Sequence, residues 1–281
     1  MTNSLKPLDF GKGLTPLDEA LAELEAYQPS EPNQPSPEPE PSPAPIEAST
    51  DIQGSYILMP QTNRYAQGVH ALQQACVDES NKNHPTKNGI YRPLIFKEDL
   101  QARLEDYETL RDERGNERSF DDRIRFFKRW LDSCCGVAYK GGTTKFKLVP
   151  ICNELVTIDQ GFNRAALDVN YGSIQGTELD SGKAKCGKLL TKSEIENHPA
   201  WIAAVEGDVE LLKSYRDVVF DILRERNPQK KMPSKAMRFW VLNSPSNDQL
   251  RALFVNIIDY NSNAGGDKYL DDYGSFLRVA P

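Results

Sequence analysis

The chain has 281 residues and a formal net charge of −7, and residues 1–53 alone carry −8 from two lysines and ten acids, so the remainder nets about +1. This nearly neutral body argues against a general polyphosphate-binding surface, because non-specific nucleic-acid binding depends on clustered excess cations. No stretch approaches the roughly 18 apolar residues of a membrane span, and no signal peptide opens the sequence. The five cysteines are an odd set in a chain long enough to build a core without disulfides. We therefore expect a cytoplasmic protein with no membrane association.

The first predicted element is a short amphipathic helix over about 15–27. Thr15 caps it, and Pro16 takes the first helical position, where its missing N–H costs nothing. A helix of about 13 residues is marginal alone in water, so its leucine stripe needs another surface. We expect it to dock in a groove of a protein partner; folding back on the chain's own body, or a tail without stable contacts, are the alternatives. The partner-binding residues are Leu17, Leu21, Leu24, Asp18, Glu19 and Glu23.

A proline-rich tether over 28–49 follows this helix, with proline at almost every second or third position. Proline fixes φ and removes a hydrogen-bond donor, so the segment is expected to be extended and solvated. A long spacer suits a helix that binds a partner at high local concentration. The sequence therefore predicts an acidic N-terminal region over 1–53 and one globular domain over 54–281.

The first half of the domain is predicted to alternate strands and helices. Residues 55–60 indicate a short strand, the spacing of Tyr65, Val69, Leu72 and Cys76 a helix, and residues 90–96 an extended edge run. Further helices are expected from Leu100 to about Gly115 and over 119–132. Residues 136–149 then read as a β-hairpin around a tight turn at Gly141-Gly142.

The second half is predicted to open with a strand over 153–159 and a glycine-rich irregular stretch over 160–190. Capping signals at Thr191, Pro199 and Asp208 announce three helices. Residues 236–242 indicate a strand, 246–260 a strongly apolar helix and 274–280 a closing strand. This mixed order, with one clear hairpin, favours a single α+β domain.

Two motifs partly match known ligand-binding loops, but each lacks residues that would bind the ligand or close the loop. Gly182 and Gly187-Lys188 match the start of a P-loop, but Leu189 stands where a magnesium-binding hydroxyl is needed. Asp259, Asn261 and Asn263 have calcium-loop spacing, but the turn glycine and the closing Glu are absent. No cysteine or histidine has zinc-ligand or nucleophile spacing. We therefore expect no metal, no cofactor and no catalytic residue, with the cysteines as packing residues.

Basic residues alternate with aromatic ones in three places, including Phe126 and Trp130 in the helix expected over 119–132. If the fold gathers them, they would form a groove for nucleic acid; the alternative is ordinary solvated faces. These candidate residues are Arg125, Lys128, Arg129, Lys183, Lys185, Lys188, Lys230, Lys231 and Arg238.

The leading hypothesis is a non-catalytic adaptor that binds one protein partner through the tethered helix and a second through the globular domain. The first alternative is a nucleic-acid-associated accessory protein that uses the basic and aromatic patches. The second is an enzyme whose active site does not show in motif spacing.

Overall fold

The computed structural model describes residues 56–81, 92–112, 114–226, 233–258 and 261–279, all within the second of two units into which the chain divides, Ile46–Pro281. The helices are α2 (Tyr65–Asn81), α3 (Phe96–Glu108), α4 (Phe120–Arg123), the 3-10 turn η1 (Phe126–Lys128), α5 (Asn153–Val156), α6 (Lys192–Glu196), α7 (Pro199–Ala204) and α8 (Val209–Arg226). The strands are β1 (Tyr56–Leu58), β2 (Leu131–Tyr139), β3 (Lys145–Val149), β4 (Leu167–Asp168), β5 (Thr177–Asp180), β6 (Met237–Trp240), β7 (Gln249–Val255), β8 (Ser262–Lys268) and β9 (Leu277–Val279).

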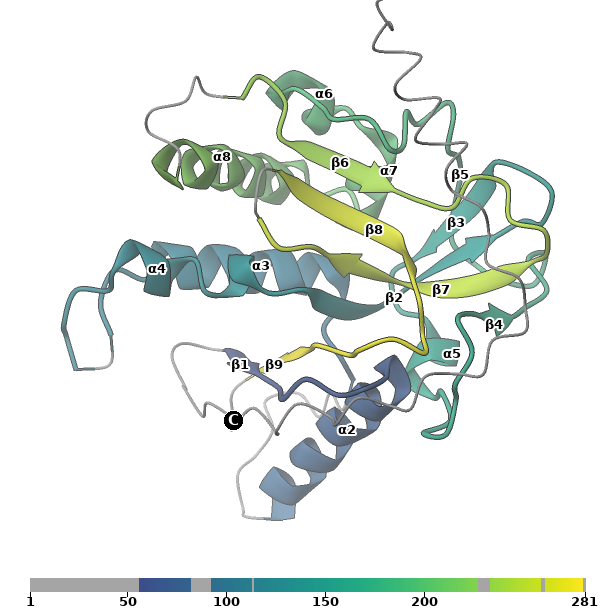
Figure 1. Ribbon diagram of the computed structural model, residues 1–281, viewed down its shortest axis with the longest axis horizontal. Helices are drawn as coiled ribbons and strands as arrows, with labels where there is room; N and C mark the ends of the chain where they lie inside the picture. Colours follow the sequence, from purple (N-terminus) through teal and green to yellow (C-terminus); the bar gives the residue numbers. More distant parts are fainter. Residues whose placement is uncertain (1–55, 82–91, 113, 227–232, 259–260, 280–281) are drawn as a thin grey trace, which may run out of the picture. The chain divides into compact units, whose positions relative to one another are not determined.

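A mixed sheet organises these elements (Figure 1). Its strand order is β5-β3-β2-β7-β8-β6, with β4 beside the first residues of β7. Neighbouring strands are antiparallel except β6 and β8, which run parallel. The first and last described strands, β1 and β9, form a separate two-stranded ribbon in which Tyr56 pairs with Val279. The α+β class predicted from the sequence is confirmed.

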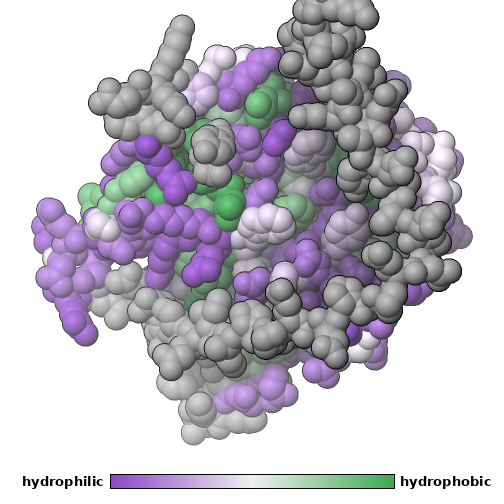
Figure 2. All heavy atoms as spheres, in the orientation of Figure 1, coloured by the Kyte–Doolittle hydropathy of each residue, from purple (hydrophilic) through white to green (hydrophobic). Residues whose placement is uncertain are grey.

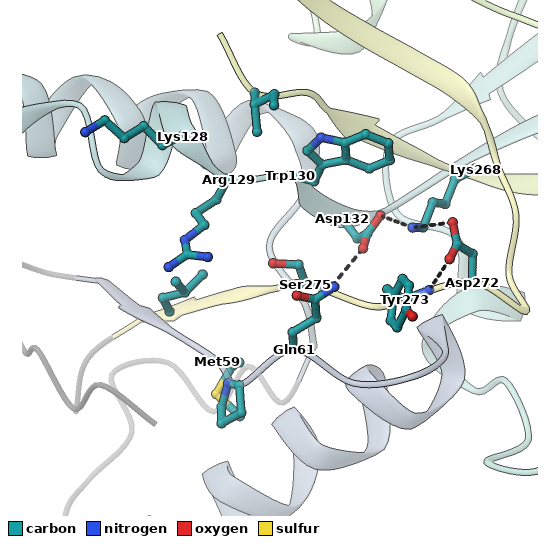
Figure 3. Close-up of a pocket in the computed structure, with 13 residues that line it drawn as sticks. Met59, Gln61, Lys128, Arg129, Trp130, Asp132, Lys268, Asp272, Tyr273 and Ser275 are labelled. Atoms are coloured by element: carbon teal, nitrogen blue, oxygen red, sulfur yellow. Dashed lines mark hydrogen bonds and ion pairs between the residues drawn. The ribbon is translucent and has the colours of Figure 1, made fainter. Parts of the chain in front are cut away.

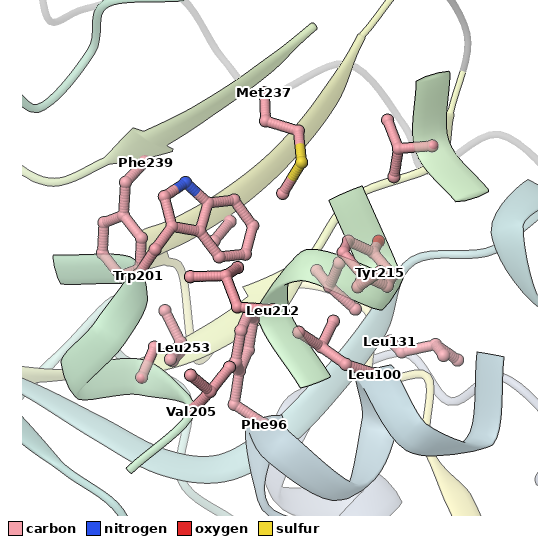
Figure 4. Packing of buried hydrophobic residues seen from close by; sticks show 14 of the residues in the cluster. Phe96, Leu100, Leu131, Trp201, Val205, Leu212, Tyr215, Met237, Phe239 and Leu253 are labelled. Carbon is pink, nitrogen blue, oxygen red and sulfur yellow. The ribbon is translucent and has the colours of Figure 1, made fainter. Parts of the chain in front are cut away.

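Each face of the sheet has its own apolar core. On one face α3, α7 and α8 pack around Trp201, whose ring meets Phe239 edge-on at 5.7 Å and Phe96 at 5.9 Å (Figure 4). On the other face α2 packs on β2 and β7 together with Met59 and Phe276, which flank β1 and β9, and Tyr65 and Phe276 are in edge contact at 5.2 Å. Leu58 and Leu277 of the ribbon itself pack with the first core. The two central strands β2 and β7 are therefore buried along their whole length.

Several predicted elements are confirmed with their local signals. The capping box of Thr191 and Glu194 begins α6, Pro199 begins α7, and α2 and α8 carry the predicted apolar stripes. The hairpin of β2 and β3 is present, but Tyr139 and Phe146 are its last paired residues, so the connection is wider than the predicted two-residue turn.

The helix predicted over 119–132 is wrong. The chain forms only the single turns α4 and η1 there, and Leu131 already begins β2. Arg118 donates to the Asp122 carbonyl, which a continuous helix would use internally, and the buried Arg103 donates to the Arg129 carbonyl just before β2. The pairing of Leu131 and Asp132 with β7, together with these hydrogen bonds, outweighs the helical periodicity of this segment.

The apolar helix predicted over 246–260 is also wrong, because residues 249–255 form the central strand β7. A strand buried on both faces shows a continuous apolar run, which periodicity does not separate from a buried helix. Three smaller predictions fail as well: 153–156 is a helical turn, the described residues 92–95 form no strand, and the calcium-like segment contributes residues 262–268 to β8.

The Arg103 side chain connects four parts of the domain from a fully buried position. It donates to the Tyr215 hydroxyl of α8 at 3.0 Å and to the carbonyls of Asn256 and Val255, after and at the end of β7, at 3.0 and 3.3 Å. It also donates to the Arg129 carbonyl at 2.7 Å. A buried cation is tolerated when it is hydrogen-bonded, so these acceptors on its two terminal nitrogens replace most of the solvation that the guanidinium loses. Its Nε has no hydrogen-bond partner among the described residues.

We predict that Arg103→Met lowers the free energy of unfolding by about 3 kcal/mol or more, since three carbonyls and the Tyr215 hydroxyl lose their donor. The exposed Arg164, which pairs with Asp168 and lies over the Phe162 ring, is the matched control, and Arg164→Met is expected to cost less than about 1 kcal/mol. Urea unfolding of the two variants measures both values. Equal losses would show that Arg103 is not a structural centre.

Candidate functional site

A pocket of about 460 Å³ lies between residues of the β1–β9 ribbon and residues of β2 and β8 in the main sheet. We call it the Trp130 pocket. Residues 58–61, at the end of β1 and just after it, form one side, and residues 128–130, just before β2, form another. Asp132 of β2, Lys268 at the end of β8 and the segment 272–275 complete it (Figure 3). Its volume falls in the range of small-molecule and side-chain binding sites.

The aromatic wall of the pocket is Trp130, whose side chain is 42% exposed. Its ring stacks on Phe254 of β7 with centroids 5.5 Å apart and an angle of 20°. Gly265, the partner of Phe254 in β8, makes room for this stack, since a Cβ there would lie 2.3 Å from the Phe254 ring. The indole therefore rests on a fixed support while part of its surface stays exposed. The exposed Tyr273 stands at another side of the pocket.

Two buried, oppositely charged groups form the floor. Lys268 is 4% exposed and Asp132 is 1% exposed. The Lys268 ammonium lies 3.8 Å from the Asp132 carboxylate, 3.9 Å from the Asp272 carboxylate and 5.7 Å from the Trp130 ring centroid. These separations exceed hydrogen-bond length. The ammonium therefore keeps N–H groups that no described residue accepts.

Only one of the two oxygens of the Asp132 carboxylate accepts a hydrogen bond from the described residues. One oxygen accepts the Ser275 backbone N–H at 2.8 Å, and the other is buried without a hydrogen-bond donor among the described residues. Burial raises the pKa of Asp132 to about 6, although Lys268 and the Ser275 N–H act in the opposite direction. A ligand that donates or accepts hydrogen bonds at this floor would complete both groups.

A third charged group faces the pocket from its rim. The Arg129 side chain is exposed, and within the described ranges its guanidinium has no hydrogen-bond or ion-pair partner. Figure 3 shows it pointing into the pocket, on the opposite side from Lys268. Lys128 also lines the pocket, but it pairs with Asp121 at 2.5 Å.

The other residues predicted to bind nucleic acid are dispersed. Arg125 turns away to Asp106 at 3.1 Å. Lys183 lines a second, smaller pocket with Lys145 and Glu178. The Lys185–Lys188 loop lies beside β6, where Gly187 donates to the Phe239 carbonyl.

Arg238 of β6 donates to Asn263 and stacks over Trp240 at 4.8 Å. The strand register puts Trp240, Gly265 and Phe254 in one row, so this second aromatic group shares a sheet face with the Trp130 pocket. Lys230 and Lys231, and all of the predicted partner-binding residues from Leu17 to Leu24, lie outside the described residues.

Three buried cysteines and His198 are poorly suited to nucleophilic or acid–base chemistry. None of the five cysteines, all of them among the described residues, is in a disulfide, and burial raises the pKa of Cys134, Cys152 and Cys186 to about 12. Burial lowers the pKa of His198 to about 4. Within the described ranges no group of three His, Cys, Asp or Glu side chains is placed to hold a metal ion.

In the described part of the chain, no helix is both long and apolar enough to cross a membrane. The face seen in Figure 2 is mostly hydrophilic, with small apolar areas between charged side chains. On that face, outside the grey residues, binding would depend on local anchors rather than on a broad apolar interface.

Comparison with known proteins supports the fold. No protein-family model matches the chain, and no curated protein matches it. Among solved structures, it is similar to a protein described as showing the "accommodation of massive sequence variation in Nanoarchaeota by the C-type lectin fold". The TM-score is 0.50 with 15% identity, over 82% of this chain and 100% of the other. At this identity the likeness shows a C-type-lectin-like fold and nothing about the ligand.

Sequence reasoning named three members of the pocket, Lys128, Arg129 and Trp130, but placed them on a helix and considered them for nucleic-acid binding. It missed Asp132, Lys268 and Tyr273. Asp132 and Lys268 are far apart in the sequence, and no spacing rule joins them. The available signal was Trp130, a large aromatic residue directly after two basic ones in the sequence.

The raised pKa of Asp132 predicts a pH-dependent stability. The pKa of Asp132 in the folded chain, about 6, exceeds the ordinary value of 3.8, so folding favours the protonated carboxyl. Its contribution to the free energy of unfolding is therefore fully present below pH 3.8 and is lost as pH rises through 6. In Asp132→Asn this dependence disappears, while the amide oxygen still accepts the Ser275 N–H. The difference in unfolding free energy between the two chains should change by about 2–3 kcal/mol over this window, to the disadvantage of the unmodified chain at high pH. Chemical unfolding at several pH values measures it, and a difference that stays constant contradicts the burial of this carboxylate.

Proposed function

We propose that the protein is a non-catalytic adaptor whose globular domain binds a protein partner at the Trp130 pocket, while the tethered helix over 15–27 binds a second partner. The observation that carries this proposal is the exposed indole of Trp130, held on Phe254 above a floor of incompletely hydrogen-bonded charges. Tryptophan and arginine in a defined pocket are typical anchors of protein interfaces.

Three further observations support this proposal. They concern the absence of catalysis, the cytoplasmic location and the suitability of the fold for binding. The Cys134, Cys152 and Cys186 thiols are protonated by burial, which suits packing better than nucleophilic attack. Cysteines outside disulfides fit a reducing compartment. The fold neighbour is described as accommodating massive sequence variation, and a scaffold that tolerates variation suits the recognition of a partner by exposed side chains.

The second candidate function is nucleic-acid binding, and one observation favours it. Arg238 stacks over the exposed Trp240 next to the loop that carries Lys185 and Lys188. A cation beside an exposed ring is a feature of single-strand binding surfaces. Binding of this kind would depend on Trp240 and would be abolished by nuclease.

A matched pair of tyrosines tests the domain half of the proposal. Tyr273 lines the pocket and Tyr269 does not, and both are 54% exposed. We predict that Tyr273→Ser weakens retention of a lysate protein by the immobilised full chain at least ten-fold, that Tyr269→Ser leaves it unchanged, and that nuclease has no effect. Equal effects of the two substitutions would refute the pocket as the docking site. Nuclease-sensitive retention lost in Trp240→Ser would favour the second candidate function.

The adaptor half has its own test. The double substitution Leu21→Asp and Leu24→Asp should remove a different retained protein and leave the Tyr273-dependent one in place, because two sites are used. Both variants are compared with the full chain by quantitative mass spectrometry of the retained proteins. If the double substitution changes nothing, the helix is not a docking element.

A further inference from the structure

The charges of the Trp130 pocket define which group of a partner enters it. Arg129 at the rim and Lys268 at the floor both have N–H groups without close acceptors among the described residues. Two donors in a pocket call for a ligand with acceptors, and an arginine fork fits a carboxylate in particular. The ligand chemistry is therefore anionic at the Arg129 side.

The two cations are not close enough to a common point to suggest one small anion. Figure 3 shows Arg129 and Lys268 on opposite sides of the pocket, with the Trp130 ring between them. A ligand that satisfies both needs a carboxylate at one end, a neutral acceptor such as a carbonyl at the other, and an apolar group between them. The apolar group would lie on Trp130 and near Leu58 and Ile257, which also line the pocket.

The floor adds a requirement for a donor. The free oxygen of Asp132 is buried without a hydrogen-bond donor in the described part of the chain, and Asp272 stands close to the same ammonium. An N–H next to the carbonyl of the ligand would fill this position, since an unpaired buried acceptor costs about 1–3 kcal/mol. A polypeptide chain end has all four features: a terminal carboxylate, a side chain, a backbone carbonyl and a backbone N–H.

We propose that the Trp130 pocket binds the C-terminal carboxylate of a partner polypeptide whose last residue has a large apolar side chain. The inference rests on the proposed function, because it names the part of the partner that enters the same site. The Arg129 guanidinium holds the carboxylate, Trp130 packs on the last side chain, and Lys268 donates to the preceding carbonyl. The pocket volume of about 460 Å³ leaves room for about one residue beyond the last.

The test uses the full-length chain and three probes: the peptide acetyl-Gly-Ser-Gly-Phe with a free C-terminus, the same peptide as its C-terminal amide, and 3-phenylpropionate. Binding is followed through the indole N–H signals of the three tryptophans in ¹⁵N-labelled protein and by calorimetry. We expect the acid peptide to shift the Trp130 signal and to leave that of the fully buried Trp201 in place. The amide should bind at least ten-fold more weakly, because it lacks the charge that Arg129 pairs.

Matched variants assign the contact. Arg129→Gln should weaken binding of the acid peptide at least ten-fold, so that its affinity approaches that of the amide peptide. Arg164→Gln, which removes an equal charge from an exposed site outside the pocket, should change nothing. Equal binding of acid and amide, or an Arg129→Gln variant that binds as well as the unmodified chain, overturns the proposal.

The remaining outcomes separate this proposal from the proposed function. Binding of 3-phenylpropionate as tight as that of the acid peptide would overturn the chain end as the source and leave a small carboxylic acid as the ligand. If no probe binds while Tyr273→Ser still loses its partner, the carboxylate inference fails and the proposed docking site stands. If no probe binds and Tyr273→Ser behaves like Tyr269→Ser, both fail.

Discussion

The buried guanidinium of Arg103 is the constraint on which the candidate site depends. It binds the Arg129 carbonyl and thereby fixes the backbone that presents Arg129 and Trp130 to the pocket. The same group donates to the Val255 carbonyl at the end of β7, next to Phe254, which supports the Trp130 ring. Arg103 therefore holds the backbone on both sides of the aromatic stack. No carboxylate neutralises it directly: burial raises the pKa of the neighbouring Asp99 well above its usual value. Backbone carbonyls and the Tyr215 hydroxyl satisfy the charge instead.

The pocket exists because the two ends of the described domain meet beside the sheet. The β1–β9 pairing brings residues 58–61 and 272–275 together, and the main sheet supplies Asp132 from β2 and Lys268 from β8, the two strands on either side of β7. The resulting floor is electrostatically close to neutral but incomplete in hydrogen bonds. Since burying such groups costs stability unless they are satisfied, a structure that keeps them open beneath an exposed tryptophan suits ligand binding better than core packing.

The parts of the fold that sequence predicts are those set by local chemistry. Capped helices such as α6 and α7 were found because the caps act within four residues. The strand β7 was mistaken for a helix because burial on both faces hides its alternation. The helix over 119–132 was mistaken because Leu131 and Asp132 pair with β7 and Arg103 binds the Arg129 carbonyl, contacts that come from distant parts of the sequence. The site has the same non-local origin. Arg129 and Lys128 were identified as candidate residues, but their companions Asp132, Lys268 and Tyr273 come from strands and turns that only the fold brings together.

The central claim, that the globular domain binds its ligand at Trp130, is tested most directly by intermolecular nuclear Overhauser effects in the complex with acetyl-Gly-Ser-Gly-Phe. The measurement observes contacts between the phenylalanine ring of the peptide and individual protein side chains. The account predicts effects to the indole of Trp130 and to the ring of Tyr273. Effects to Trp240 and none to Trp130 would contradict it and would move the binding site to the β6 side of the sheet.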